Sequence, residues 1–272
     1  MLKPVLTSQW AFPSFIIPKK DGTARFVSDF RLLNELLLDY VHDLPLIKDV
    51  LTRRSGYDWV TIIDLTSQFY HFILTRFVSK LCTITTPFGR YEYQRLPMGV
   101  KIAPSFAQAV MIRLFRDLVY VECFIDDIAI FTKGSFKQHL KDVQICLARL
   151  DRSNFSIKPK KCFFAIKEVE YLGHIITPDG VKPQPKKVDA ILRLAPPSNP
   201  KQLRQFIGMV NYYRDHIKMR SHTLTPLTAQ TKQKKHINWT PECQAAFQQI
   251  KSQLAQNALL SFPNPNFIFV LE

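Results

Sequence analysis

The sequence predicts an α+β protein whose C-terminal part is mostly helical. Up to about residue 180, short strand-like apolar runs alternate with stretches of helical spacing. After about Val181 the apolar spacing is mostly helical. Hydrophobic residues make up 46% of the 272 residues, which suits a packed core and argues against disorder.

The strands expected in the first part are bounded by turn residues. Residues 12–33 predict a hairpin, because two apolar runs flank the turn signal Asp21-Gly22-Thr23. Residues 59–65 predict an apolar strand that ends at Asp64, and residues 80–96 alternate around a turn at 87–90. Residues 121–131 predict a strand, a turn and a second strand. Residues 168–177 predict one strand, followed by a turn at 178–180.

Four helices are expected from apolar spacing and from start signals. The first spans 103–117, with Pro104 near its start, and the second spans 136–154. A linker at 195–202 ends in the start of the third helix, with Asn199 as N-cap and Pro200 at the first helical position. The fourth begins with the corresponding pair Thr240 and Pro241. Their expected apolar faces are, in order, Phe106, Val110, Leu114; Leu140, Val143, Leu147, Leu150; Leu203, Phe206, Ile207, Val210; and Phe247, Ile250, Leu254.

The charge balance favours a polyanionic partner. The chain has 37 Lys+Arg against 22 Asp+Glu, a net charge of +15. Nucleic acid is the first partner to consider and a membrane surface the second, although a basic protein with a solvated charged face has the same composition. Five cysteines without C-x-x-C spacing predict neither a disulfide framework nor a zinc site, and favour a reducing intracellular setting. No apolar run approaches the ~18 residues of a membrane helix, and the first residues lack the apolar segment of a signal peptide.

Three aspartates stand where apolar strands end or turn: Asp64, Asp126 and Asp127. Carboxylates gathered on neighbouring strands repel each other unless a cation is present, and Mg²⁺ is held by one or two carboxylates plus substrate phosphates. Two such ions can clamp the attacking and leaving oxygens of a phosphoryl transfer. A basic chain with this pattern indicates a nucleic-acid polymerase or nuclease. The competing interpretation of the doublet alone is ordinary turn chemistry.

Several segments in order resemble reverse transcriptases of gypsy-like long-terminal-repeat retrotransposons. They are SQWAFPSFIIPKKDGTARFVSDFRLLNE, TIIDLTSQFYHFIL, TPFGRYEYQRLPMGVKIAPSFAQ, FIDD, KPKKCFFAIKEVEYLGHII, LRQFIGMVNYYRDHI and WTPECQAAFQQIKSQL. The resemblance covers nearly the whole chain. It implies a right-hand polymerase fold, with fingers at 1–40 and 73–102, palm at 41–72 and 103–180, and a helical thumb at 181–236. The start of a connection segment would occupy 237–272.

The resemblance also implies the catalytic roles. Asp64 and Asp126 would be the principal ligands of two Mg²⁺ ions, for which Mn²⁺ could substitute, and Asp127 would complete the cluster less directly. The backbone carbonyl of Leu65 could add a ligand. Lys161 matches the family's lysine motif and would protonate the leaving pyrophosphate, although a plain basic patch with its neighbouring lysines explains it about as well.

Substrate-binding residues follow by position. Lys19 or Lys20 with Arg25 would hold the triphosphate of a dNTP, since guanidinium forks suit phosphate oxygens. Phe69 resembles a steric gate against the 2′-hydroxyl, with the adjacent Tyr70 as the competing assignment, and Met98 and Gly99 would lie near template or nucleotide. The resemblance implies that a primer-gripping hairpin follows the lysine motif, and Leu172 and Gly173 would sit in this primer grip. Lys201 and Arg204 would face an RNA or DNA template–primer duplex.

Three departures from the family pattern matter. Phe124 stands where the aspartate box usually begins with tyrosine, which predicts altered fidelity or efficiency. Met98 stands where relatives carry glutamine or phenylalanine, and its thioether makes only weak hydrogen bonds. After Ile217 the acidic residues are Glu242 and Glu272, so we expect no ribonuclease H domain or activity and a fragment of a longer polyprotein.

The leading hypothesis is therefore an RNA-directed DNA polymerase without membrane association, located in the cytoplasm or in virus-like particles. The resemblance leaves open a homodimer and polyprotein neighbours such as protease, ribonuclease H and integrase. The alternatives are an inactive element remnant that still binds nucleic acid, an RNA-dependent RNA polymerase, and a structural or membrane-surface basic protein.

Overall fold

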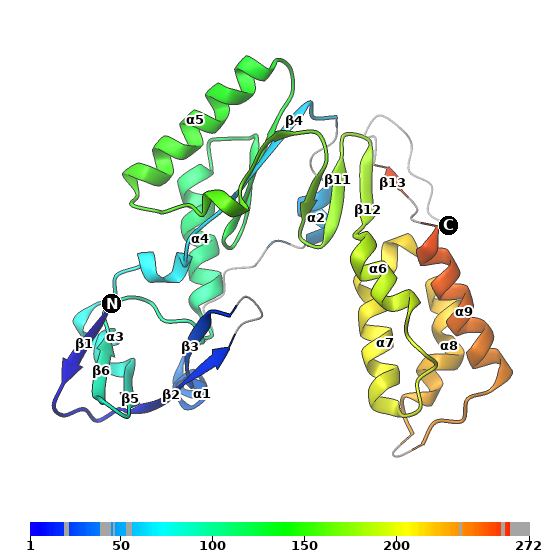
Figure 1. Ribbon diagram of the computed structural model, residues 1–272, viewed down its shortest axis with the longest axis horizontal. Helices are drawn as coiled ribbons and strands as arrows, with labels where there is room; N and C mark the ends of the chain where they lie inside the picture. Colours follow the sequence, from blue (N-terminus) through cyan, green and yellow to red (C-terminus); the bar gives the residue numbers. More distant parts are fainter. Residues whose placement is uncertain are drawn as a thin grey trace. The chain divides into compact units, whose positions relative to one another are not determined.

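The computed structural model describes residues 1–18, 22–38, 45, 47–52, 56–233, 236–256 and 259–261. The chain divides into two compact units (Figure 1). The first comprises Met1–Leu46 and Trp59–Ala165, and the second comprises Ile47–Asp58 and Ile166–Glu272. Sheets and helices occur together in both units, which confirms the α+β class. The predicted boundaries of fingers, palm, thumb and connection segment stay predictions.

The first unit contains a five-stranded sheet in the order β1-β6-β5-β2-β3. Its neighbouring strands are antiparallel except for the parallel pair β2 and β5. The hairpins expected at 12–33 and 80–96 form the pairs β2–β3 and β5–β6. Two short helices, α1 and α3, belong to the same unit as this sheet. The bounds are β1 Leu2–Val5, β2 Phe12–Pro18, β3 Ala24–Ser28, α1 Arg31–Leu36, α3 Arg76–Leu81, β5 Thr83–Thr86 and β6 Gly89–Tyr93.

A second sheet of the first unit, in the order β7-β8-β4-β9, carries the three aspartates. The expected strand at 59–65 is β4, and the expected pair at 121–131 is β7 with β8. Helices α4 and α5 share one hydrophobic core with this sheet. The bounds are β4 Trp59–Asp64, η1 Gln68–His71, α4 Ala103–Phe115, β7 Val121–Phe124, β8 Asp127–Thr132, α5 Phe136–Arg152, η2 Pro159–Lys161 and β9 Phe163–Ile166.

The apolar faces predicted for α4 and α5 were partly wrong. In α4, Phe106 is 39% exposed, whereas its neighbour Ala107 and Met111 are fully buried. In α5, Leu140 is 50% exposed, whereas its neighbour His139 is fully buried. The other predicted residues fared better: Val143 and Leu150 are buried, and Leu114 and Leu147 pack against the same core. Apolar spacing alone missed the small and polar side chains that also face the sheet.

The buried polar face of α5 is held by hydrogen bonds to the two central strands. His139 Nε2 lies 2.7 Å from Thr61 Oγ1 on β4, and its Nδ1 lies 2.9 Å from Thr132 Oγ1 on β8. Thr132 donates to Asp142 Oδ2, and Gln138 donates to Asp142 Oδ1. Buried polar groups cost little when they are paired in this way. The network fixes α5 against the strands that end and begin at the aspartates.

The second unit contains a four-stranded sheet, β10-β11-β12-β13, and, among the described residues, the α-helices α2 and α6 to α9. The single strand expected at 168–177 was wrong, because Leu172 and Gly173 turn the chain and divide the segment into β10 and β11. The bounds are α2 Ile47–Thr52, β10 Val169–Tyr171, β11 His174–Thr177, β12 Gly180–Pro183, α6 Pro185–Leu192, α7 Pro200–Tyr212, η3 Arg214–His216, α8 Arg220–Gln230, α9 Pro241–Ala255 and β13 Leu260–Ser261.

Helices α6 to α9 pack around one hydrophobic core. Both predicted N-caps are present: Asn199 accepts a hydrogen bond from the Gln202 backbone, and Thr240 accepts one from the Cys243 backbone. The apolar faces expected for α7 and α9 lie in or against this core. Helix α9, expected to begin a connection segment, therefore shares its core with the helices before it. No helix in the described part of the chain combines the length and apolar character that crossing a membrane requires.

Candidate active site

The strand register brings two of the aspartates opposite each other. Asp64 ends β4 and is the Cα partner of Asp127, which begins β8. Phe124 is the other Cα partner of Asp127, so only Ile125 and Asp126 form the turn between β7 and β8. Ile125 has a φ of 55°, which is costly for a β-branched residue. A two-residue turn of this kind must therefore be held by its surroundings.

Two glutamine side chains hold the turn. The amide of Gln108, on α4, donates to the carbonyl of Cys123 at 2.8 Å and accepts from the backbone N–H of Ile125 at 2.7 Å. The amide of Gln68, on η1, donates to the Ile125 carbonyl at 2.9 Å. Both glutamines are buried. Elements on both sides of the turn thus fix the backbone that carries Asp126.

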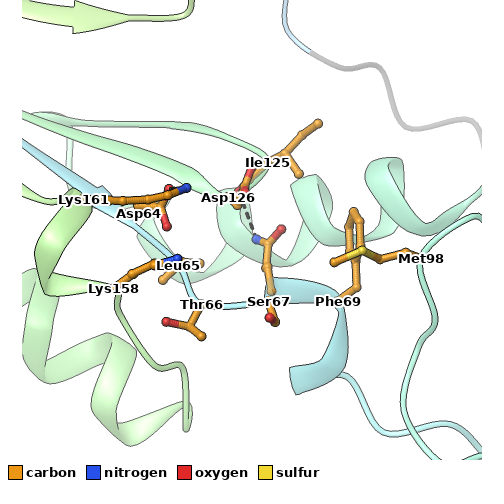
Figure 2. A pocket seen from close by; sticks show the side chains of 11 residues that line it. Asp64, Leu65, Thr66, Ser67, Phe69, Met98, Ile125, Asp126, Lys158 and Lys161 are labelled. Carbon is orange, nitrogen blue, oxygen red and sulfur yellow. Dashed lines mark hydrogen bonds and ion pairs between the residues drawn. The ribbon is translucent and has the colours of Figure 1, made fainter. Parts of the chain in front are cut away.

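Asp64 and Asp126 line one pocket of about 220 Å³. Two lysines from the segment just before β9, Lys158 and Lys161, line it as well (Figure 2). The Nζ of Lys161 lies 3.0 Å from Asp64 Oδ2 and donates a hydrogen bond to it. The lining residues do not include Asp127. The pocket therefore combines two carboxylates with cationic side chains, a composition suited to phosphate chemistry.

Burial and repulsion between carboxylates make Asp126 and Asp127 reluctant to ionise. Burial raises the pKa of Asp126, and the charge of Asp64 raises it further, against a lowering by the backbone of Asp126 itself. Burial raises the pKa of Asp127 to about 6, and the charges of Asp126 and Asp64 contribute. The hydrogen bond to Asp64 raises the pKa of Lys161. A site with these shifts gains from an additional cation.

The donor set fits a hard divalent cation that also binds substrate phosphates. Among the described residues, no group of three or more His, Cys, Asp and Glu side chains is arranged to hold a metal ion. Magnesium, however, usually takes only one or two carboxylates and completes its shell with water and phosphate oxygens. Asp64 and Asp126 supply those two carboxylates in one pocket.

Three other predicted residues line the same pocket: Leu65, Phe69 and Met98 (Figure 2). The backbone N–H of Leu65 donates to the Asp126 carbonyl at 3.1 Å, which ties β4 to the turn. Tyr70, the competing gate residue, does not line the pocket, and its hydroxyl pairs with Tyr93. The structure therefore places Phe69, rather than Tyr70, in the pocket that Asp64 and Asp126 line.

The backbone conformation and the surroundings of residue 99 both favour glycine. Its φ is +99°, and a Cβ there would lie 3.3 Å from the carbonyl oxygen of Ser28. The side chain of Asn34 accepts from the backbone N–H of Lys101 and donates to the carbonyl of Gly99, both at 2.8 Å. Arg25 lies on β3 with an exposed side chain and does not line the pocket. The predicted triphosphate ligands Lys19 and Lys20 lie outside the described residues.

The remaining predicted site residues belong to the second unit. Leu172 and Gly173 form the two-residue turn between β10 and β11, with φ values of 46° and 71°. Lys201 and Arg204 lie on α7 with exposed side chains. The second unit thus presents a tight turn and exposed basic side chains.

Sequence reasoning missed the residues that support the site: Gln68, Gln108, Asn34 and Lys158. Gln68 and Gln108 are polar residues at buried positions of η1 and α4, and such positions break an apolar pattern. That break was the available signal. Their partners are backbone atoms of a distant turn, which no local pattern indicates.

The comparisons with known proteins agree on one family. Residues 17–176 match the family described as reverse transcriptase (RNA-dependent DNA polymerase). The retrovirus-related Pol polyprotein from transposon 297 of Drosophila melanogaster is 32% identical over 97% of this chain and 26% of its own length. The transposon Tf2-7 polyprotein of Schizosaccharomyces pombe is 33% identical over 92% of this chain and 19% of its own length. The chain thus spans about a quarter or less of these relatives.

The fold of this chain is similar to the folds of solved protein structures. The foamy viral protease-reverse transcriptase in complex with double-stranded DNA has a TM-score of 0.91 at 24% identity, covering 97% of this chain and 47% of that one. The same protein with an RNA/DNA hybrid has a TM-score of 0.85 at 24% identity, covering 96% and 35%. This likeness confirms the expected right-hand polymerase fold.

Proposed function

Because this chain belongs to the reverse transcriptase family, we propose that it is an RNA-directed DNA polymerase that adds dNMP units to a primer 3′-hydroxyl. The observation that carries the proposal is the pocket in which Asp64 and Asp126 meet Lys161. The primer 3′-oxygen would attack the α-phosphorus of a dNTP. A new P–O bond forms, the bond to the bridging oxygen breaks, and pyrophosphate leaves.

Asp64 and Asp126 would hold divalent cations together with the triphosphate, and Asp127 would contribute through its charge. When bound, two Mg²⁺ ions, or Mn²⁺ in their place, would neutralise the charge of the triphosphate and lower the pKa of the primer hydroxyl. Lys161 would release its hydrogen bond to Asp64 and donate a proton to the leaving pyrophosphate. A lysine ammonium is protonated at neutral pH, so the proton is present when pyrophosphate leaves.

The sugar and base would contact the apolar part of the pocket. Phe69 would leave no room for a 2′-hydroxyl and so favour dNTPs over rNTPs. Met98 and the glycine at 99 would form the wall near the base pair. Lys19, Lys20 and Arg25 remain proposed ligands of the triphosphate, on the resemblance of their segment to the family.

The duplex would contact both units. Leu172 and Gly173 would hold the primer strand, and Lys201 and Arg204 would contact phosphates. The foamy viral relatives were solved with double-stranded DNA and with an RNA/DNA hybrid, which supports a template–primer duplex as partner. The retrotransposon relatives are polyproteins, so we propose polyprotein neighbours and leave open a homodimer. All five cysteines are free thiols, in keeping with the proposed intracellular location.

The test is extension of a DNA primer on an RNA template with Mg²⁺ and either dNTPs or rNTPs. We expect incorporation of dNTPs and much slower incorporation of rNTPs. Tight binding of the duplex without any incorporation would contradict the proposal and identify an inactive nucleic-acid-binding remnant. Preferential use of rNTPs would indicate an RNA polymerase instead.

A further inference from the structure

The turn between β10 and β11 has a backbone that its own sequence does not favour. Leu172 and Gly173 both have positive φ, the geometry of a type I′ turn, which asparagine and glycine adopt most readily. Leucine at the first position is strained there. Contacts from outside the hairpin must therefore hold this turn in place.

Those contacts come from Tyr212, the last residue of helix α7, and from its C-cap Tyr213. The hydroxyl of Tyr212 donates to the Leu172 carbonyl at 2.5 Å, and the hydroxyl of Tyr213 donates to the Gly173 carbonyl at 3.0 Å. Consecutive tyrosines thus bind the two consecutive carbonyls of the turn. Tyr213 also bonds with the backbone of Gln184, directly before α6. Both turn residues are joined to the helical part of their unit.

Aromatic packing reinforces the hydrogen bonds. The ring of His174, the first residue of β11, stacks on Tyr212 with centroids 5.3 Å apart and on His216 with centroids 5.9 Å apart. Its Nδ1 lies 3.1 Å from the Leu172 carbonyl. Lys187 Nζ lies 5.2 Å from the centroid of the Tyr212 ring. The hairpin is therefore packed on a layer of rings, and not only bonded at its tip.

A side chain at Gly173 would also force the ends of the Lys187 and Tyr212 side chains to move. A Cβ at that position would lie 2.5 Å from Lys187 Nζ and 2.9 Å from the Tyr212 hydroxyl. Such contacts are not seen in folded proteins without rearrangement. The glycine thus serves both the positive φ and the close contact with α7.

We propose that Tyr212 and Tyr213 are positioning residues that lock the Leu172–Gly173 turn onto helix α7, so that turn and helix hold the primer strand as one rigid piece. The role of the turn in holding the primer rests on the proposed function. The lock itself rests on the contacts above. The two tyrosines touch no reacting atom, and they act through the backbone that they bind.

The experiment compares Tyr212→Phe, Tyr213→Phe and the double variant with the parent. The matched control is Tyr57→Phe, because the Tyr57 hydroxyl also donates to backbone carbonyls of the same unit, those of Lys167 and Ile176. Amide hydrogen exchange of residues 171–174 in the free protein reports on the lock. Single-nucleotide extension and duplex affinity, measured separately, report on the primer.

We expect each tyrosine variant to speed exchange of the turn by about 2- to 10-fold, the worth of one net hydrogen bond, and the double variant to exceed either one. The double variant should lower the rate of nucleotide addition by about 10-fold while duplex affinity changes less than about twofold. Tyr57→Phe should lower the free energy of unfolding of the unit, but it should change neither the hydrogen exchange of the turn nor the rate of nucleotide addition.

Unchanged exchange of the turn in the double variant would overturn the lock. Faster exchange with an addition rate no lower than that of Tyr57→Phe would overturn the primer role. A parent that adds no nucleotide, with faster exchange in the variants, would leave the lock in place and overturn the proposed function.

Discussion

Replacement of Gln108 by leucine tests how the turn carrying Asp126 is held. Gln108 is fully buried, and its amide satisfies the Cys123 carbonyl and the Ile125 N–H. Leucine has a similar volume, so the change removes two hydrogen bonds without opening a large cavity. It leaves the buried carbonyl of Cys123 and the half-buried N–H of Ile125 without these partners.

A buried group left unsatisfied costs about 1–3 kcal/mol, and the half-buried group costs less, so the expected loss of unfolding free energy is roughly 1–4 kcal/mol. The strained Ile125 also loses one of its restraints, so Asp126 should no longer keep one position. A displacement of about 1 Å at a reacting centre can cost about 100-fold in rate. Nucleotide addition should therefore fall by about that factor under conditions where the variant remains folded.

Urea unfolding followed by two probes measures the stability, and single-nucleotide extension measures the rate. Gln138→Leu is the control, because the Gln138 side chain donates its hydrogen bond to another side chain, that of Asp142. We expect the control to lose about 1 kcal/mol and little activity. If Gln108→Leu lost no more stability than Gln138→Leu, or kept full activity, the reasoning about the turn would be wrong.

Three further predictions follow from single side chains. Phe69→Ala should raise the use of rNTPs relative to dNTPs on the order of 10- to 100-fold, and unchanged nucleotide selection would contradict the gate. Phe124→Tyr should change the misincorporation rate in primer extension, and an identical rate would contradict an effect of the missing hydroxyl. Burial lowers the pKa of His139, against the opposing charge of Asp142. At pH values below 6.5, the ordinary pKa of histidine, unfolding is therefore accompanied by uptake of a proton. Stability should therefore fall as the pH drops from 7 to 5.5, more steeply than in His139→Asn, and equal slopes would refute this.

The residues that define the site could be predicted from sequence, because they stand at strand ends in ordered motifs. Strand register then fixed what the motifs left open: Asp64 and Asp127 face each other, whereas Asp126 shares the pocket with Asp64. The proposed steric gate is a similar case. Two adjacent aromatics were candidates, and the structure placed Phe69 rather than Tyr70 in the pocket.

What the sequence could not predict were contacts between distant backbone and side-chain atoms. The turn at 172–173 lacks the asparagine that marks such turns, so periodicity indicated one continuous strand. Only the tyrosines forty residues later explain it. In α5, His139 and Asp142 are polar, so apolar spacing assigned the buried face to Leu140 instead. Their hydrogen bonds to Thr61 and Thr132 make the polar face the inner one.

The most direct measurement of the central claim is single-turnover addition of one dNMP to a primed RNA template by the parent and by Asp126→Asn. Asparagine keeps the shape of the side chain and tolerates turns, so the substitution removes mainly the charge. We predict Mg²⁺-dependent addition with one pyrophosphate released per nucleotide, and a loss on the order of 1,000-fold or more in the variant with duplex binding retained. Equal rates in the two proteins would contradict the account.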